Sequence, residues 1–262
     1  MSANLIRKFL LNLKFKNIKS LTYDDIRIVP LMHYNVKNHK LVRRVYESFY
    51  DIFLSANCLP EGPSVELGTG YGFLKEYSKK NIICSDINSD FNIDIKFSAE
   101  SIPFRNNSVS AYFMFGVLHH IKDVKSMLSE ITRTLKLHGR IIMIEPYNSI
   151  WARFLYRISH SEPFKPDAGW QIEGNRPLSD ANLALPWIIF FKDRKAFELK
   201  YTRLKINRLQ LHNSILFQLS GAGAYNTLLP GFLYPAINSF EKLLKPFYKY
   251  LAMFVTIELE KI

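Results

Sequence analysis

Short apolar runs alternate with segments of helical periodicity between about residue 61 and residue 146. The apolar runs have the length of buried strands, and strands are expected at residues 64–67, 82–86, 95–98, 109–115 and 140–145. Between the last two, Val124 to Leu135 carries apolar residues at helical spacing, and His138-Gly139 is expected to cap that helix. The alternation predicts an α/β fold, in which a doubly wound, mostly parallel sheet has helices on both faces.

The first sixty residues are expected to form an N-terminal helical lid (1–60). Residues 2–19 predict a basic amphipathic helix, since apolar residues share one face and every charge is positive. Such a helix either lies on an anionic membrane surface or packs as a lid, and both alternatives stay open. Residues 24–30 are interpreted as a connector and residues 39–56 as a second helix with buried aromatic side chains. Proline and glycine at residues 60–63 end this region.

The pattern changes after Pro146. Helices are expected at about residues 150–159 and 181–191, while residues 204–211 and 254–260 alternate as two strands. Residues 147–200 and 214–251 are interpreted as cap insertions that build an acceptor pocket. The core domain is therefore placed at residues 61–146, and residues 147–262 are expected to hold the caps and a C-terminal pair of strands.

A glycine-rich turn follows the first expected strand, with Gly68, Gly70 and Gly72 leading into a helix from about Phe73 to Lys79. Glycine lets a ligand approach the main chain closely, and the helix N-terminus offers free N–H groups. Asp86 ends the next strand, where a carboxylate can accept the hydrogen bonds of two ribose hydroxyls. A dinucleotide fingerprint needs a third glycine at the position of Phe73, so this spacing does not match it.

The segment from Ser64 to Pro146 resembles the class I S-adenosylmethionine (SAM)-dependent methyltransferases, in particular the small-molecule methyltransferases of bacteria. The resemblance rests on residues 66–72, Asp86, residues 99–104, residues 117–120 and Glu145-Pro146, in that order. It implies a Rossmann-like sheet of seven strands with an antiparallel last strand, and SAM as cofactor. The cofactor-binding residues that it implies are Glu66, Gly68, Gly70, Gly72, Asp86, Ile87, Ser98, Ala99 and Phe115.

Two positions depart from the family's pattern. Ser98 stands where the family usually has the aspartate that receives the adenine amine, and the acid usual near the start of the fourth strand is replaced around Ser110. A serine still accepts a hydrogen bond, and Glu100 is near. Cofactor binding therefore stays the expectation.

Methyl transfer from a sulfonium needs alignment, exclusion of water and sometimes a base, because the cofactor supplies the electrophile. His119 and His120 follow the fourth strand, and Glu145 ends the fifth, so these three residues are the candidate catalytic groups. The alternative is that one histidine packs under the cofactor and the other caps the next helix.

A second polar segment, residues 160–182, is expected to recognise the acceptor through His160, Glu162, Trp170 and Asn182. The alternative for this segment is a solvated, proline-rich connector without a binding role. Metal binding is a further interpretation of the same residues. No metal is predicted, because a single His-x-Glu lacks a second ligand pair at helical spacing.

The chain carries a formal net charge of +12 and only two cysteines, Cys58 and Cys84. The charge predicts an anionic partner, and the absence of the motifs of DNA methylases excludes DNA. We expect an O-methyltransferase that acts on a small-molecule, glycan or lipid-linked acceptor. It is expected in the cytoplasm, either free or peripheral at the inner face of the membrane through residues 2–19. An RNA methyltransferase and a non-catalytic SAM-fold partner protein are the alternatives, RNA being the less favoured partner.

Overall fold

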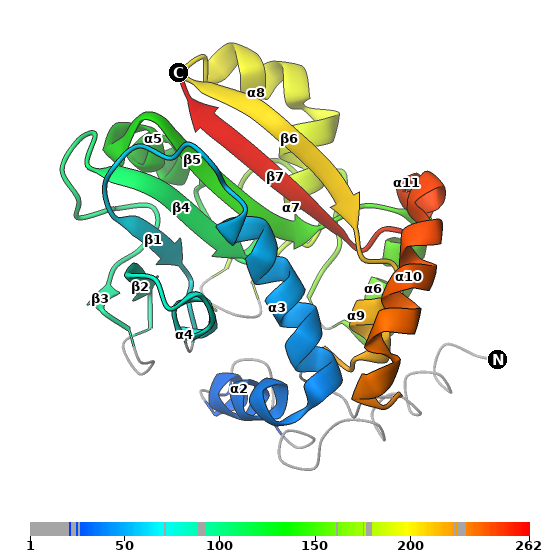
Figure 1. Cartoon of the computed structure of the whole chain (residues 1–262). Helices are drawn as coiled ribbons and strands as arrows, with labels where there is room; N and C mark the ends of the chain where they lie inside the picture. The colour runs from blue at the N-terminus through cyan, green and yellow to red at the C-terminus, as the bar shows by residue number, and fades with distance from the viewer. Residues whose placement is uncertain are drawn as a thin grey trace.

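The computed structural model describes residues 21, 25, 27–70, 72–88, 93–160, 162–174, 176, 180–222, 224 and 229–262. The helix expected at residues 2–19 lies outside these residues. The described chain forms one seven-stranded sheet with helices on both faces (Figure 1).

The strands follow the predicted alternation closely. They are β1 (Ser64–Leu67), β2 (Ile82–Asp86), β3 (Ile95–Lys96), β4 (Val109–Phe115), β5 (Leu135–Pro146), β6 (Leu204–His212) and β7 (Phe254–Lys261). Their order in the sheet is β3-β2-β1-β4-β5-β7-β6. β7 runs antiparallel to both of its neighbours, and the pairs from β3 to β5 are parallel. The predicted Rossmann-like sheet with an antiparallel last strand is confirmed.

The α-helices range from single turns to a helix of 15 residues. They are α2 (Ile28–Asn38), α3 (Lys40–Leu54), α4 (Phe73–Ser78), α5 (Val124–Thr134), α6 (Ile150–Ser159), α7 (Leu185–Trp187), α8 (Arg194–Lys200), α9 (Leu216–Leu219), α10 (Tyr234–Leu243) and α11 (Tyr248–Leu251). Single turns of other helix types are η1 (Leu118–His120), the π-helical η2 (Ile188–Lys192), η3 (Gly231–Leu233) and η4 (Lys245–Phe247).

Two apolar clusters fill the space on the two sides of the sheet. One joins the sheet to α5, η2 and α8, and the other joins it to α3, α4, α6 and α9. The helix α3 crosses the sheet in the foreground of Figure 1 and buries Val45, Phe49 and Phe53 almost completely. Each such side chain contributes about 1.5–3 kcal/mol by leaving water. These aromatic residues belong to the core, as predicted.

Two local predictions were wrong. The helix α5 ends at Thr134, and His138-Gly139 does not cap it, because β5 already begins at Leu135. Residues 28–30, interpreted as part of a connector, begin the helix α2. Pro30 is tolerated there because the first turn of a helix has no intrahelical partner for its N–H groups.

No helix in the described part of the chain is long and apolar enough to cross a bilayer.

Candidate functional site

The candidate site lies along the edge where the parallel strands β1, β2, β4 and β5 end. Their carboxyl ends meet there because right-handed crossovers return each strand in the same direction. The glycine turn follows β1, Asp86 ends β2, η1 follows β4, and Glu145 lies at the end of β5. The topology alone therefore brings together residues that are up to eighty positions apart.

The glycine turn requires residues without a Cβ for two reasons, its backbone conformation and its close contacts. Gly68, Gly70 and Gly72 all have positive φ, at 67°, 54° and 72°. A Cβ on Gly68 would also stand 2.5 Å from Cγ2 of Val117, and one on Gly70 would stand 3.5 Å from Cγ1 of Val29. The space beside Gly68 is thus taken by the chain's own Val117. The sequence argument foresaw a ligand there but not this contact.

Asp86 is turned towards the glycine turn. Its Oδ2 accepts the Gly70 N–H at 3.1 Å, and its Oδ1 accepts the Asn88 N–H at 3.0 Å. Burial raises the pKa of Asp86 above its usual value, while these backbone donors oppose the shift. The strand tip and the turn therefore form one hydrogen-bonded unit.

Glu66 is buried under the same turn. Its carboxyl group accepts the Thr69 hydroxyl, and burial raises its pKa to about 8, with a smaller contribution from Asp86. A cation beside this group would restore its charge.

The remaining predicted cofactor residues are spread around this unit. Ile87 is 56% exposed just after Asp86, and Ala99 is buried. Ser98 accepts the N–H of Glu100 at 3.2 Å. Phe115 packs in an aromatic cluster, with ring centroids 5.4 Å from Tyr46 and 5.0 Å from Phe49. The side chain of Phe115 thus joins the apolar packing between β4 and α3.

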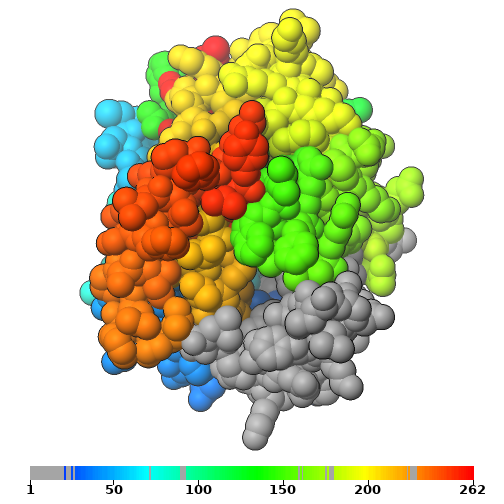
Figure 2. Space-filling view, turned by 90° about the vertical axis from the view of Figure 1, so that its right-hand side faces the viewer, coloured from blue at the N-terminus to red at the C-terminus, as the bar shows by residue number. Residues whose placement is uncertain are grey.

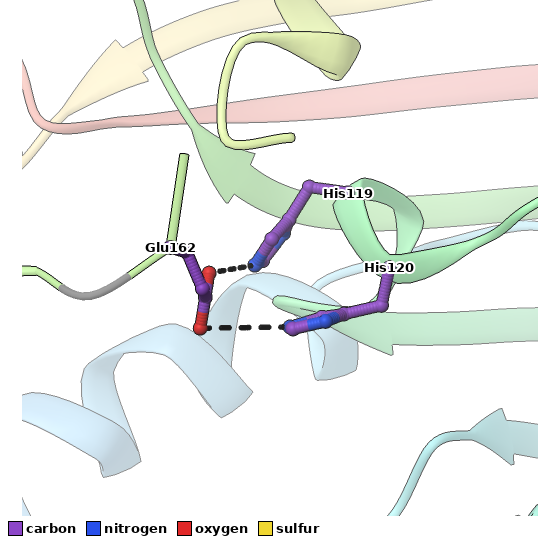
Figure 3. Close-up of side chains that lie close together, drawn as sticks. All are labelled: His119, His120 and Glu162. Carbon is purple, nitrogen blue, oxygen red and sulfur yellow. Dashed lines mark ion pairs between the residues drawn. The ribbon is translucent and has the colours of Figure 1, made fainter. Parts of the chain in front are cut away.

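The second part of the site is a cluster of histidines around Glu162, which we call the His–Glu cluster (His119, His120, Glu145, His160 and Glu162). Nδ1 of His119 lies 2.7 Å from Oε2 of Glu145, and its Nε2 lies 3.3 Å from Oε2 of Glu162. Nε2 of His120 lies 3.9 Å from Oε1 of Glu162. Nδ1 of His160 lies 3.8 Å from Oε2 of the same carboxylate. Figure 3 shows both imidazoles of η1 directed at Glu162.

The carboxylates decide the charge of the cluster. Burial, the largest influence, lowers the pKa of His119, but Glu145 and then Glu162 outweigh it and raise that pKa well above its usual value. Burial and then the charge of His119 lower the pKa of His120. Burial raises the pKa of Glu162, but the neighbouring histidines, His119 first, bring it below its usual value. The two adjacent histidines therefore differ in protonation.

Glu145 is fully buried and is occupied by the chain itself. Its Oε1 accepts the backbone N–H groups of Val117 and Leu118, each at 2.8 Å, while its Oε2 faces His119. This carboxylate orients His119 and fixes the start of η1. Of the three predicted catalytic residues, it is the one whose contacts suit positioning.

Asn182 fastens the segment that carries Glu162. Its side chain accepts the Lys165 N–H at 2.9 Å and donates to the Lys165 carbonyl at 3.0 Å, while its own N–H donates to the His119 carbonyl at 2.8 Å. Trp170 lies elsewhere, where its Nε1 donates to Asp193 and its ring stacks on Tyr201 beside α8. The structure thus gathers His160 and Glu162 with His119 and His120, places Asn182 behind them, and leaves Trp170 at α8.

The helix α2 is an element near the glycine turn that the sequence interpretation missed. His33 stacks on Phe73 with centroids 4.1 Å apart, and Lys37 pairs with Glu76, so α2 lies against the helix that follows the glycine turn. Its buried Ile28, Asn35 and Val36 recur at helical spacing. That periodicity was readable, but Pro30 in the first turn disguised it.

Comparisons with known proteins agree with this fold. Residues 65–143 match the family model described as "Methyltransferase domain". No curated protein matches the chain.

Among solved structures, a geranyl diphosphate methyltransferase in complex with SAM is 12% identical, with 84% of this chain and 87% of that chain covered and a TM-score of 0.51. A SAM-dependent methyltransferase from Archaeoglobus fulgidus is 14% identical, with 84% and 94% covered and a TM-score of 0.49. A geranyl diphosphate C-methyltransferase from Streptomyces coelicolor is 15% identical, with 84% and 78% covered and a TM-score of 0.47. At these identities the likeness is one of fold, and it leaves the acceptor and the methylated atom open.

Proposed function

We propose that this chain, a class I SAM-dependent methyltransferase, transfers the methyl group to a hydroxyl oxygen. The proposed acceptor is a small molecule, a glycan or a lipid-linked compound. The observation that carries the proposal is the His–Glu cluster beside the glycine turn. Val117 touches Gly68, and the two histidines of η1 follow it after Leu118. A hydroxyl is a weak nucleophile, so an oxygen acceptor needs such a polar group next to the cofactor.

The glycine turn and its two acids form the proposed cofactor end of the site. Gly68, Gly70 and Gly72 bring main chain against the methionine part of SAM, Glu66 takes its ammonium, and Asp86 takes its ribose hydroxyls. Ile87, Ser98 and Ala99 flank the proposed adenine position. SAM supplies the electrophilic methyl group, and these residues hold it in line with the acceptor.

The His–Glu cluster forms the proposed acceptor end. His119, His120 and Glu162 face one another there, and Glu145 holds His119 in its orientation. His160 adds a third imidazole on the segment from the cap. An acceptor hydroxyl placed among these groups would be polarised as it attacks the methyl group, while the surrounding burial excludes water.

The face formed by α6, α10 and α11 favours a lipid-linked acceptor. α11 packs against α6, and Figure 2 shows the two segments, red and green, next to each other. Large apolar side chains are exposed on these helices and their connections: Ile150, Phe154, Phe232, Phe240, Leu243, Phe247 and Tyr250. Within residues 150–159 and 231–251 the exposed charges are all positive: Arg153, Arg157, Lys242, Lys245 and Lys249.

An aromatic and basic surface suits an interface with anionic lipid, where apolar side chains enter the acyl boundary and cations meet the headgroups. The end of α6 leads directly to His160, so a lipid bound on this face would hold its headgroup near the cluster. Residues 2–19 would add a second basic segment to the same interaction.

Incubation of cell fractions with labelled methyl donor tests the proposed acceptor class. Label is expected in lipid or polysaccharide, and it should disappear with the Asp86→Ala variant. Label in RNA would overturn the proposal in favour of an RNA methyltransferase.

Sedimentation with liposomes tests the lipid-facing surface. Combined Lys242→Ala, Lys245→Ala and Lys249→Ala substitutions should weaken binding to anionic vesicles, at about 1 kcal/mol for each lysine. The same change at Lys195, Lys200 and Lys205, exposed at α8 and β6, alters the net charge equally and serves as control. If both variants lose the same amount of vesicle binding, the effect comes from net charge alone and not from the face formed by α6, α10 and α11.

A further inference from the structure

Three side chains of the His–Glu cluster are close enough together to serve as ligands of one metal ion. One ligand atom from each of His119, His120 and Glu162 can be chosen so that all lie within 4.8 Å of one another (Figure 3). We propose that these residues bind a divalent transition-metal ion. The sequence set metal aside because His160-x-Glu162 lacked a second ligand pair. The fold supplies that pair from η1, more than forty residues earlier.

The distances between the ligand atoms suit such an ion. Ligands about 2.1 Å from a tetrahedral metal stand about 3.4 Å apart. Nε2 of His119 is 3.3 Å from one oxygen of Glu162, and Nε2 of His120 is 3.9 Å from the other. All three ligand atoms lie within 4.8 Å of one another, so shifts of about an ångström would bring them around one ion.

His119 already has the orientation of a metal-binding histidine. Such a histidine usually gives its second ring nitrogen to a carboxylate, which fixes the ring and its tautomer. Here Nδ1 of His119 faces Glu145 at 2.7 Å, which leaves Nε2 for the side of Glu162. Glu145 is itself held by two backbone N–H groups, so this support is rigid.

The charges of the cluster leave room for a cation. Glu145 and Glu162 have side-chain exposures of 0% and 6%, and their ion pairs within the described residues are all with histidines. Oε2 of Glu162 and Nδ1 of His120 are buried and make no hydrogen bond to the described part of the chain. Two buried carboxylates whose charged partners are histidines are costly, and a dication bound in place of the His119 proton would neutralise both.

The ligand types narrow the choice of metal. Two imidazoles and one carboxylate suit Zn²⁺, Fe²⁺, Co²⁺, Ni²⁺ or Mn²⁺, whereas Mg²⁺ and Ca²⁺ prefer oxygen ligands throughout. Three protein ligands also leave a coordination position open, as in catalytic sites. His160 stands beside Glu162, and Asn182 secures the segment that carries Glu162.

The role of the ion rests on the proposed function, but its binding does not. A hydroxyl oxygen at the open position would be polarised by the metal and would lose its proton more readily. That would explain why an oxygen acceptor should lie at this end of the site. Metal binding itself can be measured without SAM or acceptor.

Titration of chelator-treated full-length protein with Co²⁺ tests the site, because Co²⁺ in a site of nitrogen and oxygen ligands absorbs visible light. One Co²⁺ per chain is expected, displaced by Zn²⁺. Glu162→Gln and His120→Asn should each weaken binding at least tenfold, while Glu198→Gln, at an exposed residue of α8, should not. Circular dichroism and calorimetry with S-adenosylhomocysteine establish that each variant is folded.

Wild-type protein that binds neither Co²⁺ nor Zn²⁺ would overturn the inference, as would a folded Glu162→Gln variant with unchanged affinity. Failure of the proposed function looks different. In that case metal binding would persist while no lipid, glycan or small molecule accepts the methyl group.

Discussion

The glycine turn and the His–Glu cluster are neighbours, but they are built in opposite ways. The turn is made within five residues, from Gly68 to Gly72, and it needs only the next strand tip to complete it. The cluster draws His119 and His120 from η1, Glu145 from β5 and Glu162 from the segment after α6. A local unit can be recognised in sequence, whereas an assembled one depends on every contact that places its parts. The two should therefore respond differently to mutation.

The largest effect is expected at Gly68. Gly68→Ala places a Cβ at positive φ and against Val117, so overpacking and backbone strain should cost about 2–5 kcal/mol of unfolding free energy. Urea denaturation measures this loss. A second substitution, Val117→Ala, should recover part of it by removing the clash. If it recovers none, the contact between Gly68 and Val117 does not account for the loss of stability.

Asp86 should come next. Asp86→Ala removes the acceptor of the Gly70 N–H and the proposed ribose contact, and hydrogen bonds to a charged group contribute about 1.5–3 kcal/mol. The affinity for S-adenosylhomocysteine should fall by about 10–150-fold in calorimetry. Asp167→Ala, which alters a carboxylate of the segment after Glu162, should leave that affinity unchanged. Equal binding by the Asp86→Ala variant would remove this residue from the cofactor site.

Asn182 separates the two regions most directly. Asn182→Ala breaks two side-chain hydrogen bonds to Lys165, at about 0.5–1.5 kcal/mol each. Amide exchange around residues 162–167 should accelerate by about 5–150-fold, while exchange at β1 and affinity for S-adenosylhomocysteine stay the same. A comparable acceleration in β1 would mean that the two regions open together.

The smallest effect is a pH dependence at Glu66. Its pKa of about 8 means that the carboxyl group is mostly neutral at pH 7, whereas a bound ammonium favours the charged form. SAM affinity should therefore rise with pH, by at most about tenfold per unit between pH 6 and pH 7. Calorimetry at several pH values measures the slope, and Glu66→Gln should flatten it.

The stability of the cofactor-free protein should change in the opposite sense. Because the folded pKa of Glu66 lies above its usual value, its contribution to stability is present at low pH and is lost as pH rises from about 4.5 through 8. Thermal melts of wild type and Glu66→Gln across this range isolate the contribution. Identical profiles would assign the dependence to other groups.

The sheet and the cofactor end were within reach of the sequence. β1, β2 and β4 were placed correctly, and α6 too, because apolar period and turn residues act within a few positions. The resemblance then implied the number of strands and the antiparallel β7. The errors at α2 and at the start of β5 arose where Pro30 and His138-Gly139 carried a local signal that tertiary packing overrode.

The acceptor end was named only in parts. The sequence analysis selected all five residues of the His–Glu cluster, but not as one site. It took His119 and His120 as candidate general bases, Glu145 as an acid at a strand end, and His160 and Glu162 as part of an acceptor-recognition loop. Their convergence depends on Asn182, which ties residue 165 to His119. These positions are far apart in sequence, and no helical or strand periodicity predicts that they meet. The exposed aromatic face of α6, α10 and α11 likewise needs the packing of α11 on α6.

By itself, the sequence determined the alternation of strands and helices, the glycine turn and the acid that follows it. These features come from backbone conformation and short-range spacing, which a chain carries wherever it folds. Only the tertiary structure decided that two histidines share a buried carboxylate and that Trp170 lies at α8 instead. Such contacts join segments distant in sequence, so burial, distance and charge had to be set by the folded chain as a whole.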